Sequence, residues 1–483
     1  MRLRTHSFAI LASLFTVATI HAGQIDPGLE TLAISSKSDQ PVLALILGKH
    51  RGLDPARIRE ILDANDVPLR NRRTVIQKEE SRENLSRLLG DLETLASKGD
   101  IQPIEFLWNV NGIAVQARPA ILVALAAHPD VDTIVMDRQV VSIGPRIEEN
   151  APLGAPRNWA IPKIKASQAW ESTGRQGNGM YVGLIDTGVD GNHPDLKHKV
   201  STFRDFTKIT APITQPYDDE GHGTHCAGSI VGGNSSGESI GVAPKATLIT
   251  AKALSADGSG GMIALTRSLQ WMADPDGDNG TDDQPIAVSG SWGANLDLPV
   301  VSRIFWLSVS SLRNAGVVPV FASGNEGPGK LSVPGSYPHS MAVGSTDEQD
   351  EVSYFTSRGT VSWGGTTYMK PDISAPGSNI YSCRAGGGYT SMSGTSMSTP
   401  HVAGAVALLA SINRNLTAKQ YEQALYDSAV DLGDSGRDAV YGYGRIDLLK
   451  AAQVVQSMAA QAGELPLFLL PPELANQRVP TVH

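Results

Sequence analysis

Cysteine is scarce in this chain, with only Cys226 and Cys383 among its 483 residues. A disulfide-rich scaffold is therefore excluded, because at most one bond can form. The sequence leaves open whether the two thiols are bonded, since a bond requires their Cα atoms to lie within about 7 Å. Positive charge is also limited, because 40 Lys and Arg stand against 49 Asp and Glu, for a formal net charge of −9. This balance disfavours nucleic acids and anionic membranes as partners.

Long apolar runs are missing as well, and the sequence therefore predicts no membrane span in the mature protein. The run from Phe8 to Ile20 falls short of the ~20 residues needed to cross a bilayer, and two arginines precede it. A basic start, a short apolar run and a small residue at Ala22 are typical of a secretory signal peptide. We therefore expect residues 1–22 to be removed and the protein to be secreted, into the medium or the periplasm.

The run SGTSMSTPHVAG, residues 393–404, is the most informative stretch of the chain. It places Ser396 at a turn that opens into an apolar helix, expected from about Met397 to Ile412 and buried on all sides. A hydroxyl at this position lies at the positive end of the helix dipole, where an anion forming on a substrate is favoured. Taken alone, the pattern also fits a simple N-cap, which is the commonest role of a serine before a helix.

Two further runs each present one ionisable residue at the end of an element. Asp186 ends the apolar strand YVGLID, and the carboxyl ends of strands form the ligand-binding edge of α/β sheets. His222 lies between two glycines at the head of a short helix, with His225 three residues later. Zinc proteases instead place two histidines four residues apart with a glutamate between them, so this pair does not predict a metal site.

Together these residues supply the parts of a nucleophilic hydrolase. A serine hydroxyl needs a base to take its proton, and an imidazole does this best when a carboxylate fixes its tautomer. Ser396, His222 and Asp186 match these three roles. Asn325 follows a predicted buried strand at 317–323 and supplies an amide donor for the oxyanion.

These motifs resemble those of the subtilisin-like serine proteases, the subtilases of peptidase family S8. The resemblance runs from about Trp159 to Leu449 and includes DTGVDGNHPDL, GHGTHCAG, ASGNEG and SGTSMSTPHVAG in the family's order. It implies a serine endopeptidase that acts as a monomer on proteins or peptides and needs no cofactor for its chemistry. Within the family, segments 270–293 and 317–329 are similar to the bacillopeptidase F group.

The resemblance also assigns roles to single residues. It implies that Asp186 orients His222, that His222 acts as base and then acid, and that Ser396 attacks the carbonyl carbon while Asn325 and the Ser396 N–H bind the oxyanion. Two segments are implied to flank an extended substrate as antiparallel strands, and their residues are Asp257, Gly258, Ser259, Gly260, Ser291, Trp292 and Gly293. Without the resemblance, DGSGG favours a plain loop, and Trp292 a core position.

The chain is expected to contain two folded parts. Residues 23–141 show the order βαββαβ, with a hairpin signal at Asn111-Gly112, and resemble the ferredoxin-like prodomain that inhibits subtilases. The alternative is a small domain retained in the mature protein. Residues 159–461 alternate strands and helices, which predicts a three-layer α/β unit with a mostly parallel central sheet. The resemblance implies that this unit is the catalytic domain and that its αβα layers form a subtilisin-like fold. The remaining parts are a linker with the processing site at 142–158 and a C-terminal tail at 462–483.

The acidic loop DPDGDNGTDD leaves two interpretations open. Asp274, Asp276 and Asp278 offer carboxylates to a calcium ion, whereas a solvated loop is the ordinary fate of a charge run. Two other functions compete with the protease. A subtilase fold that has lost activity would lack a triad residue, but Asp186, His222, Asn325 and Ser396 are all present. A lipase-like hydrolase would need its nucleophile in a Gly-x-Ser-x-Gly elbow and the order Ser, Asp, His, whereas Ser396 stands in Gly-Thr-Ser-Met-Ser and follows both Asp186 and His222.

Overall fold

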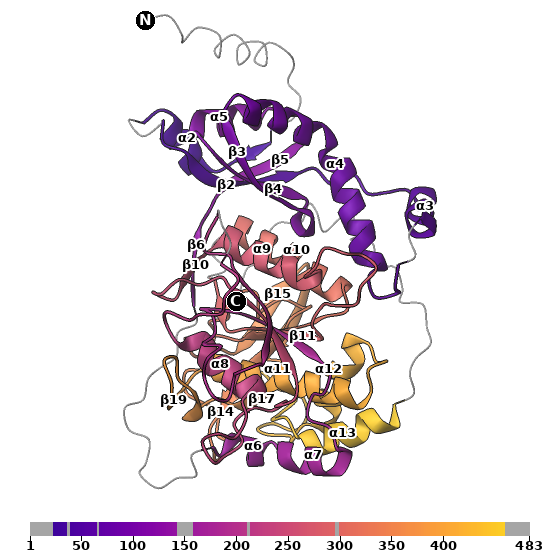
Figure 1. The fold of residues 1–483 in the computed structure, drawn as a ribbon, viewed down its shortest axis with the longest axis vertical. Helices are drawn as coiled ribbons and strands as arrows, with labels where there is room; N and C mark the ends of the chain where they lie inside the picture. The colour runs from indigo at the N-terminus through magenta and orange to yellow at the C-terminus, as the bar shows by residue number, and fades with distance from the viewer. Residues whose placement is uncertain are drawn as a thin grey trace, which may run out of the picture. The chain divides into compact units, whose positions relative to one another are not determined.

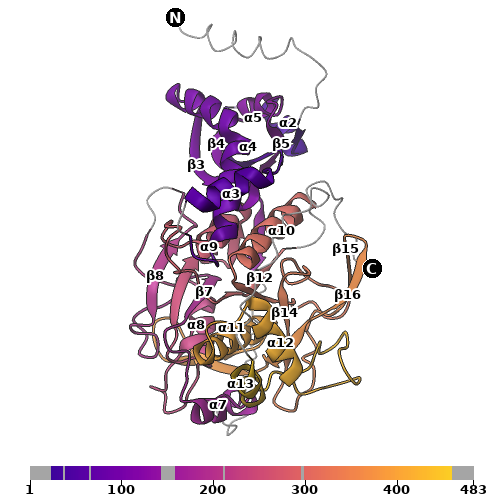
Figure 2. The ribbon, with the colours of Figure 1, turned by 90° about the vertical axis from the view of Figure 1, so that its right-hand side faces the viewer.

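A computed structural model describes residues 23–35, 39–64, 67–142, 158–209, 213–294 and 299–458 (Figures 1 and 2). Contacts divide the chain into two units. The first holds the residues before 68 together with 72–138, and the second holds Pro68–Asn71 and the chain from Gln139 onward. The expected signal peptide, nearly all of the linker and the C-terminal tail lie outside the described residues. Within the described ranges, no helix is long and apolar enough to cross a membrane.

The first unit is a five-stranded sheet covered by helices, with the strand order β1-β5-β2-β4-β3. The predicted order βαββαβ is present in β2, α4, β3, β4, α5 and β5. Asn111 takes the left-handed conformation between β3 and β4, as the Asn-Gly signal predicted. The elements are β1 (Gln24–Ile25), α2 (Pro27–Ala33), β2 (Val42–Gly48), α3 (Pro55–Ala64), α4 (Arg72–Ser97), β3 (Ile101–Leu107), η1 (Trp108–Val110), β4 (Gly112–Ala117), α5 (Pro119–Leu125) and β5 (Val131–Met136).

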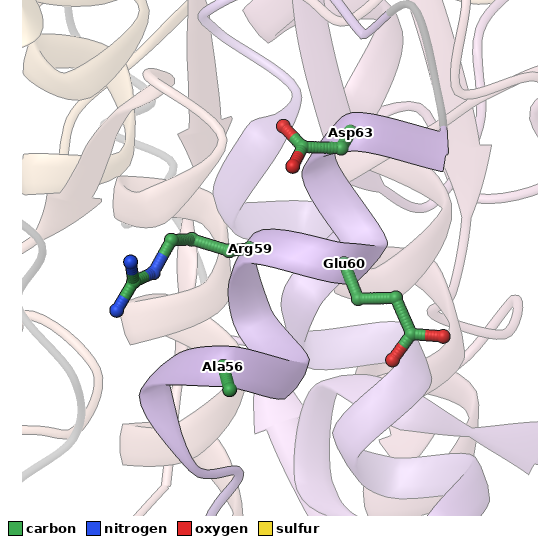
Figure 3. Close-up of a pocket in the computed structure, with 4 residues that line it drawn as sticks. All are labelled: Ala56, Arg59, Glu60 and Asp63. Carbon is green, nitrogen blue, oxygen red and sulfur yellow. The ribbon is translucent and has the colours of Figure 1, made fainter.

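Helix α4 begins at Arg72 and includes Val75 and Ile76. Both side chains are buried, and their packing overrides the low helix propensity of β-branched residues. Helix α3 was not predicted. A hollow on its surface is lined only by the exposed side chains of Ala56, Arg59, Glu60 and Asp63 (Figure 3). None of the predicted site residues lies there.

The second unit contains a seven-stranded sheet with the order β17-β14-β13-β11-β7-β9-β8, in which every neighbouring pair is parallel. The central strands are buried along their whole length, as expected when helices cover both faces. The predicted mostly parallel α/β sheet is therefore confirmed. Its strands are β7 (Tyr181–Asp186), β8 (Val200–Asp205), β9 (Thr247–Lys252), β11 (Ala287–Gly290), β13 (Val318–Ala322), β14 (Met341–Thr346) and β17 (Ile373–Pro376).

Helices form the two outer layers of this unit. Helices α9 (Met262–Ala273) and α10 (Pro299–Asn314) pack together on one side of the sheet, and α8 (His222–Val231) packs with α11 (Thr395–Ile412) on the other (Figures 1 and 2). Helix α11 is buried from Thr395 to Ser411, as its apolar sequence predicted. The remaining helices are α6 (Ala160–Lys163), α7 (Ala166–Thr173), α12 (Ala418–Ser428) and α13 (Leu448–Ser457).

Three small sheets complete the second unit. One has the order β10-β6-β12, and the others are the hairpins β15-β16 and β18-β19, which were not predicted. Their strands are β6 (Gln139–Ser142), β10 (Ser259–Gly261), β12 (Trp292–Gly293), β15 (Gly359–Trp363), β16 (Thr366–Lys370), β18 (Ile380–Cys383) and β19 (Tyr389–Met392). Cys226 and Cys383 are both free and buried, so the structure contains no bond between them.

Candidate active site

A buried carboxylate–imidazole pair lies where β7 ends and α8 begins. Asp186 is the last residue of β7 and His222 the first residue of α8, and Nδ1 of His222 lies 2.7 Å from Oδ1 of Asp186. Neither side chain is more than 1% exposed. The other ring nitrogen, Nε2, has no hydrogen-bond partner among the described residues. The pair therefore presents a fixed imidazole whose second nitrogen can accept a proton from a reacting group.

The electrostatics of the pair favour a strong base. Burial alone would lower the pKa of His222, but the adjacent Asp186 carboxylate raises it well above its usual value. A histidine with a raised pKa holds its proton more firmly once it has accepted it. This is the property needed to stabilise the imidazolium formed when a hydroxyl is activated.

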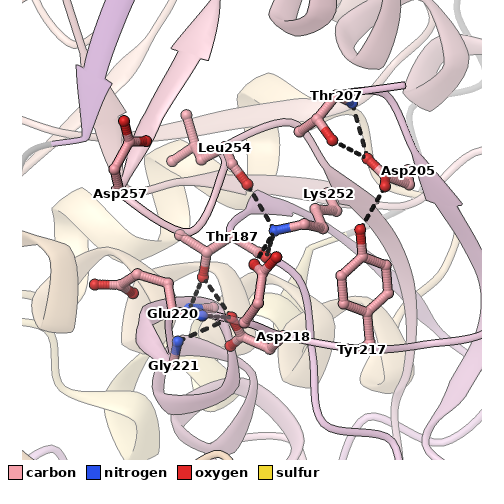
Figure 4. Close-up of polar contacts among 12 residues, drawn as sticks. Thr187, Asp205, Thr207, Tyr217, Asp218, Glu220, Gly221, Lys252, Leu254 and Asp257 are labelled. Carbon is pink, nitrogen blue, oxygen red and sulfur yellow. Dashed lines mark hydrogen bonds and ion pairs between the residues drawn. The ribbon is translucent and has the colours of Figure 1, made fainter. Parts of the chain in front are cut away.

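A polar network holds the chain on both sides of this pair. Thr187, the residue after Asp186, donates to Asp218 at 3.0 Å and accepts from the backbone N–H of Gly223 at 2.8 Å. Asp218 also accepts from the Gly221 backbone N–H at 2.9 Å (Figure 4). It accepts from the Thr224 backbone N–H at the same distance. Burial would raise the pKa of the Asp218 carboxyl, but these hydrogen bonds hold it below its usual value. The start of α8 is thus tied to the end of β7.

Lys252 lies at the centre of the same network. Its ammonium donates to the carbonyls of Thr187 at 2.6 Å and Leu254 at 2.9 Å (Figure 4). It also pairs with Asp219 at 2.5 Å. The side chain is 1% exposed, so its charge is almost fully withdrawn from water. Lys252 therefore joins three segments: the corner after Asp186, the loop before His222 and the chain leading to β10. Sequence analysis missed it, because a lysine at the end of a strand carries no recognisable signal.

Ser396 lies in the first turn of α11. The helix begins at Thr395, and its N-cap is Gly394, which provides no side-chain capping bond. The simple N-cap interpretation of Ser396 is therefore wrong. The backbone carbonyl of Ser396 accepts from the Ser291 hydroxyl at 3.0 Å and from the Cys226 thiol at 3.5 Å. Because Cys226 lies on α8 one turn after His222, these contacts bring the serine turn and the histidine helix together.

Asn325 lies beside this turn. Its side-chain oxygen accepts from the backbone N–H and from the hydroxyl of Thr395, each at 2.9 Å. Gly324, just before it, has a φ of 120°, and a Cβ there would lie 2.6 Å from the Ser357 hydroxyl oxygen. Only glycine fits this corner. The side-chain amide of Asn325 is therefore anchored through its oxygen to Thr395, the residue directly before Ser396.

The two segments expected to flank a substrate do pair with an extended strand. β6 lies between β10 and β12 and is antiparallel to both, with Gly260 opposite Val140 and Gly293 opposite Val141. Gly260 is needed here, because a Cβ would lie 2.5 Å from the Ala253 carbonyl oxygen. Residues 259–261 are thus a strand and not a plain loop, whereas Asp257 and Gly258 precede it. Trp292 contributes its backbone while its ring packs between Phe305 and Phe321.

His225 has a structural position. Its Nε2 lies 2.9 Å from the Ile380 carbonyl oxygen, and burial lowers the pKa of the ring to about 3, with a further contribution from His222. A neutral ring hydrogen-bonded to a backbone carbonyl links α8 to β18.

The acidic loop gathers a different set of carboxylates from the one predicted. Side-chain oxygens of Asp274, Asp276 and Asp283 lie within 4.8 Å of one another, whereas Asp278 is outside this group. Asp278 instead accepts from the Gly280 backbone N–H at 2.9 Å. Burial, together with Asp276 and Asp274, raises the pKa of Asp283 to about 6. A charged group beside two others of the same sign fits a cation, since a cation would relieve the repulsion.

The structure places a buried aspartate–histidine pair on a parallel α/β sheet. Comparison with known proteins identifies the family. Residues 177–444 match the subtilase family of peptidase S8, which covers more than half of the chain. The chain therefore belongs to the subtilases, a family of serine endopeptidases, and the predicted resemblance is confirmed.

Relatives with established names agree with this assignment. The chain is 32% identical over 406 residues to bacillopeptidase F of Bacillus subtilis, covering 77% of this chain but only 28% of that longer protein. It is 33% identical to an alkaline protease of Alkalihalobacillus alcalophilus, over 69% of this chain and 77% of the relative. Thermitase of Thermoactinomyces vulgaris is 36% identical, over 63% of this chain and 99% of the relative.

Proposed function

We propose that this chain is the precursor of an exported endopeptidase that cleaves peptide bonds with Asp186, His222 and Ser396. The observation that carries the proposal is the buried pair of Asp186 and His222, with Nε2 of the imidazole unpartnered among the described residues. The contacts of the Ser396 carbonyl with Ser291 and Cys226 support the placement of the serine turn beside this pair.

The proposed reaction follows from these positions. Nε2 of His222 takes the proton of the Ser396 hydroxyl as Oγ bonds to the substrate carbonyl carbon, and the carbonyl oxygen becomes an oxyanion. The amide of Asn325 and the Ser396 N–H stabilise that oxyanion. The protonated His222 then gives its proton to the leaving amine as the C–N bond breaks. A water molecule, deprotonated by His222, hydrolyses the acyl-enzyme and restores Ser396. Asp186 holds the imidazole in place throughout.

Substrate binding is proposed to use the edges of β10 and β12. β6 supplies the supporting observation, because this part of the chain already lies between them as an antiparallel strand. An extended peptide of another protein would take the same place through main-chain hydrogen bonds, with little dependence on side chains. The proposed binding residues are those predicted from the sequence: Asp257, Gly258, Ser259, Gly260, Ser291, Trp292 and Gly293.

The same arrangement supports self-processing. Strand β6 lies between β10 and β12 and is followed in the sequence by the linker, so the enzyme's own chain would be its first substrate. We propose that the cut falls between Val141 and Trp159 and that the released N-terminal part first assists folding and then inhibits. Export through the predicted signal at 1–22 and a monomeric mature form complete the proposal.

Activity is tested with a fluorogenic peptide library and the purified mature protein. The wild type should cleave peptides at internal bonds, and mass spectrometry of the products gives the residue preference. Ser396→Ala should show no cleavage above background, with an unchanged circular dichroism spectrum. Full activity in this variant would disprove the assignment of the nucleophile.

A structural calcium ion is proposed for the acidic loop, held by Asp274, Asp276 and Asp283. The grouping of their oxygens supports it. Calcium at millimolar concentration should raise the melting temperature of the wild type and not that of Asp276→Asn. An equal response of the two proteins, or none in either, would leave the solvated-loop interpretation.

A further inference from the structure

A four-residue segment between α3 and α4 belongs, by its contacts, to the second unit. The chain before it, ending at Val67, and the chain after it, starting at Arg72, both belong to the first unit. Pro68–Asn71 is thus held by the catalytic part of the protein while remaining covalently part of the N-terminal region. The contacts that hold it involve two side chains, Arg70 and Asn71.

Arg70 uses all three nitrogens of its guanidinium. Nε donates to the Ala315 carbonyl at 3.2 Å, and the two terminal nitrogens donate to the Asp282 carboxylate and the Pro285 carbonyl at 3.0 Å each. Ala315 follows the last residue of α10, where backbone carbonyls lack helical partners and the helix dipole is negative. The neighbouring Gly316 leaves room for the guanidinium, since a Cβ there would lie 3.1 Å from Nε of Arg70.

Asn71 makes a second, independent set of bonds. Its amide nitrogen donates to the carbonyls of Asn279, at 3.0 Å, and Thr281. Its side-chain oxygen accepts from the amide of Gln284 at 2.7 Å. Asn71 and Gln284 are only 7% and 4% exposed. Every polar atom of the Asn71 side chain is therefore matched by a partner on the second unit.

This binding site is remote from the catalytic residues. Pro285 and Ala315 precede β11 and β13, at the amino ends of these strands, whereas Asn325 follows the carboxyl end of β13. The five residues of β13 alone span roughly 15 Å at about 3.3 Å per residue. The site therefore lies at the opposite edge of the sheet from the proposed catalytic residues.

We propose that this surface is an exosite for the propeptide, formed by Asn279, Thr281, Asp282, Gln284, Pro285 and Ala315, and that Pro68–Asn71 is its occupant. The inference rests on the proposed function, in which the N-terminal part is cut off behind β6. After that cut the propeptide would stay attached at two separate places. Strand β6 would hold it between β10 and β12, and Arg70 and Asn71 would hold it at the exosite. Two linked attachments hold a fragment far longer than either alone, because each keeps the other at a high effective concentration.

The test follows release of the propeptide from the full chain after it has processed itself. Gel filtration measures the fraction of N-terminal fragment still bound, and a fluorogenic peptide reports the appearance of activity. Arg70→Ala should release the fragment about 10- to 100-fold faster than the wild type and shorten the lag before activity. Asp282→Ala should act in the same direction, and the double variant should release the fragment more slowly than the two single effects combined would predict. Arg82→Ala is the matched control and should behave as the wild type, because the ion pair of Arg82 with Glu79 lies within α4.

Equal release from Arg70→Ala and the wild type, in chains that process normally, would overturn the exosite while leaving the proposed function intact. If no chain processed itself, the proposed self-processing would be wrong. The exosite would then be tested separately in the Ser396→Ala precursor. Amide hydrogen exchange at 279–285 and 315–317 should be faster in the double variant Ser396→Ala/Arg70→Ala than in Ser396→Ala alone. Unchanged exchange at these residues would also overturn the exosite.

Discussion

Replacing Lys252 with methionine tests whether the buried ammonium positions the catalytic pair. Methionine fills a similar volume without a charge or a donor. The change removes the bonds to the carbonyls of Thr187 and Leu254 and the ion pair with Asp219. Thr187 directly follows Asp186, so losing the bond to the Thr187 carbonyl should loosen the backbone that positions the Asp186 carboxylate against His222.

The expected cost follows from the groups left behind. Two buried carbonyls lose their donor, and an unsatisfied buried polar group costs about 1 to 3 kcal/mol. The variant should therefore lose about 2 to 6 kcal/mol of unfolding free energy. Asp219 contributes little to this figure, since its side chain is 44% exposed and water can replace the ammonium. Displacement of a catalytic group by about 1 Å costs on the order of 100-fold in rate, so kcat should fall about 10- to 100-fold with little change in KM.

The assay combines thermal unfolding with kcat, KM and a pH profile on one fluorogenic peptide. Weaker coupling between Asp186 and His222 should also lower the pKa of His222, shifting the rising limb of the profile to lower pH. Lys245→Met, at an exposed lysine, is the control and should change neither quantity. A Lys252→Met protein that melts early but keeps the wild-type kcat and pH profile would show that Lys252 only stabilises the fold.

Three further predictions concern the proposed machinery. Asn325→Ala should lower kcat by about 100- to 1000-fold with KM nearly unchanged, because a loss of this size is typical when a serine protease loses one oxyanion donor. A rise in KM alone would instead indicate that Asn325 binds the substrate in its ground state. Asp186 raises the pKa of His222, and catalysis needs the unprotonated ring, so kcat/KM should rise with pH through a single step centred above the usual histidine pKa of 6.5. A midpoint at or below 6.5 would contradict the assigned direction of the pKa shift. Gly260→Ala should raise KM for peptides of four or more residues, since its Cβ would press on the Ala253 carbonyl, whereas an unchanged KM would exclude β10 as a binding edge.

The sequence predicted the catalytic fold well, because strong local signals mark its elements. The buried strand predicted at 317–323 agrees with β13 to within one residue at each end. Helix α11 started two residues before its predicted start, because an N-terminal boundary without a capping side chain leaves little trace. The hairpins β15-β16 and β18-β19 were missed, since their strands are short and mostly half-exposed, with no clear alternation.

The environment of the site was harder to predict than the residues in it. Asp186 and His222 stand in distinctive motifs, but their support from Lys252 depends on a partner 30 or more residues away. The same holds for the acidic loop, where Asp283, and not the predicted Asp278, lies with Asp274 and Asp276 in the folded chain. Arg70 contacts residues more than 200 positions later in the chain. Such contacts arise from tertiary structure, and no local pattern announces them.

The central claim is that Ser396 is the nucleophile and that it cleaves its own chain. The most direct measurement is the mass and N-terminal sequence of the exported wild type, Ser396→Ala and the control Ser398→Ala from a protease-deficient host. The account predicts a new N-terminus between residues 142 and 159 in the wild type and in Ser398→Ala. It predicts that Ser396→Ala retains the whole chain after the signal peptide. A normally processed Ser396→Ala protein would show that another enzyme makes the cut and would contradict the claim.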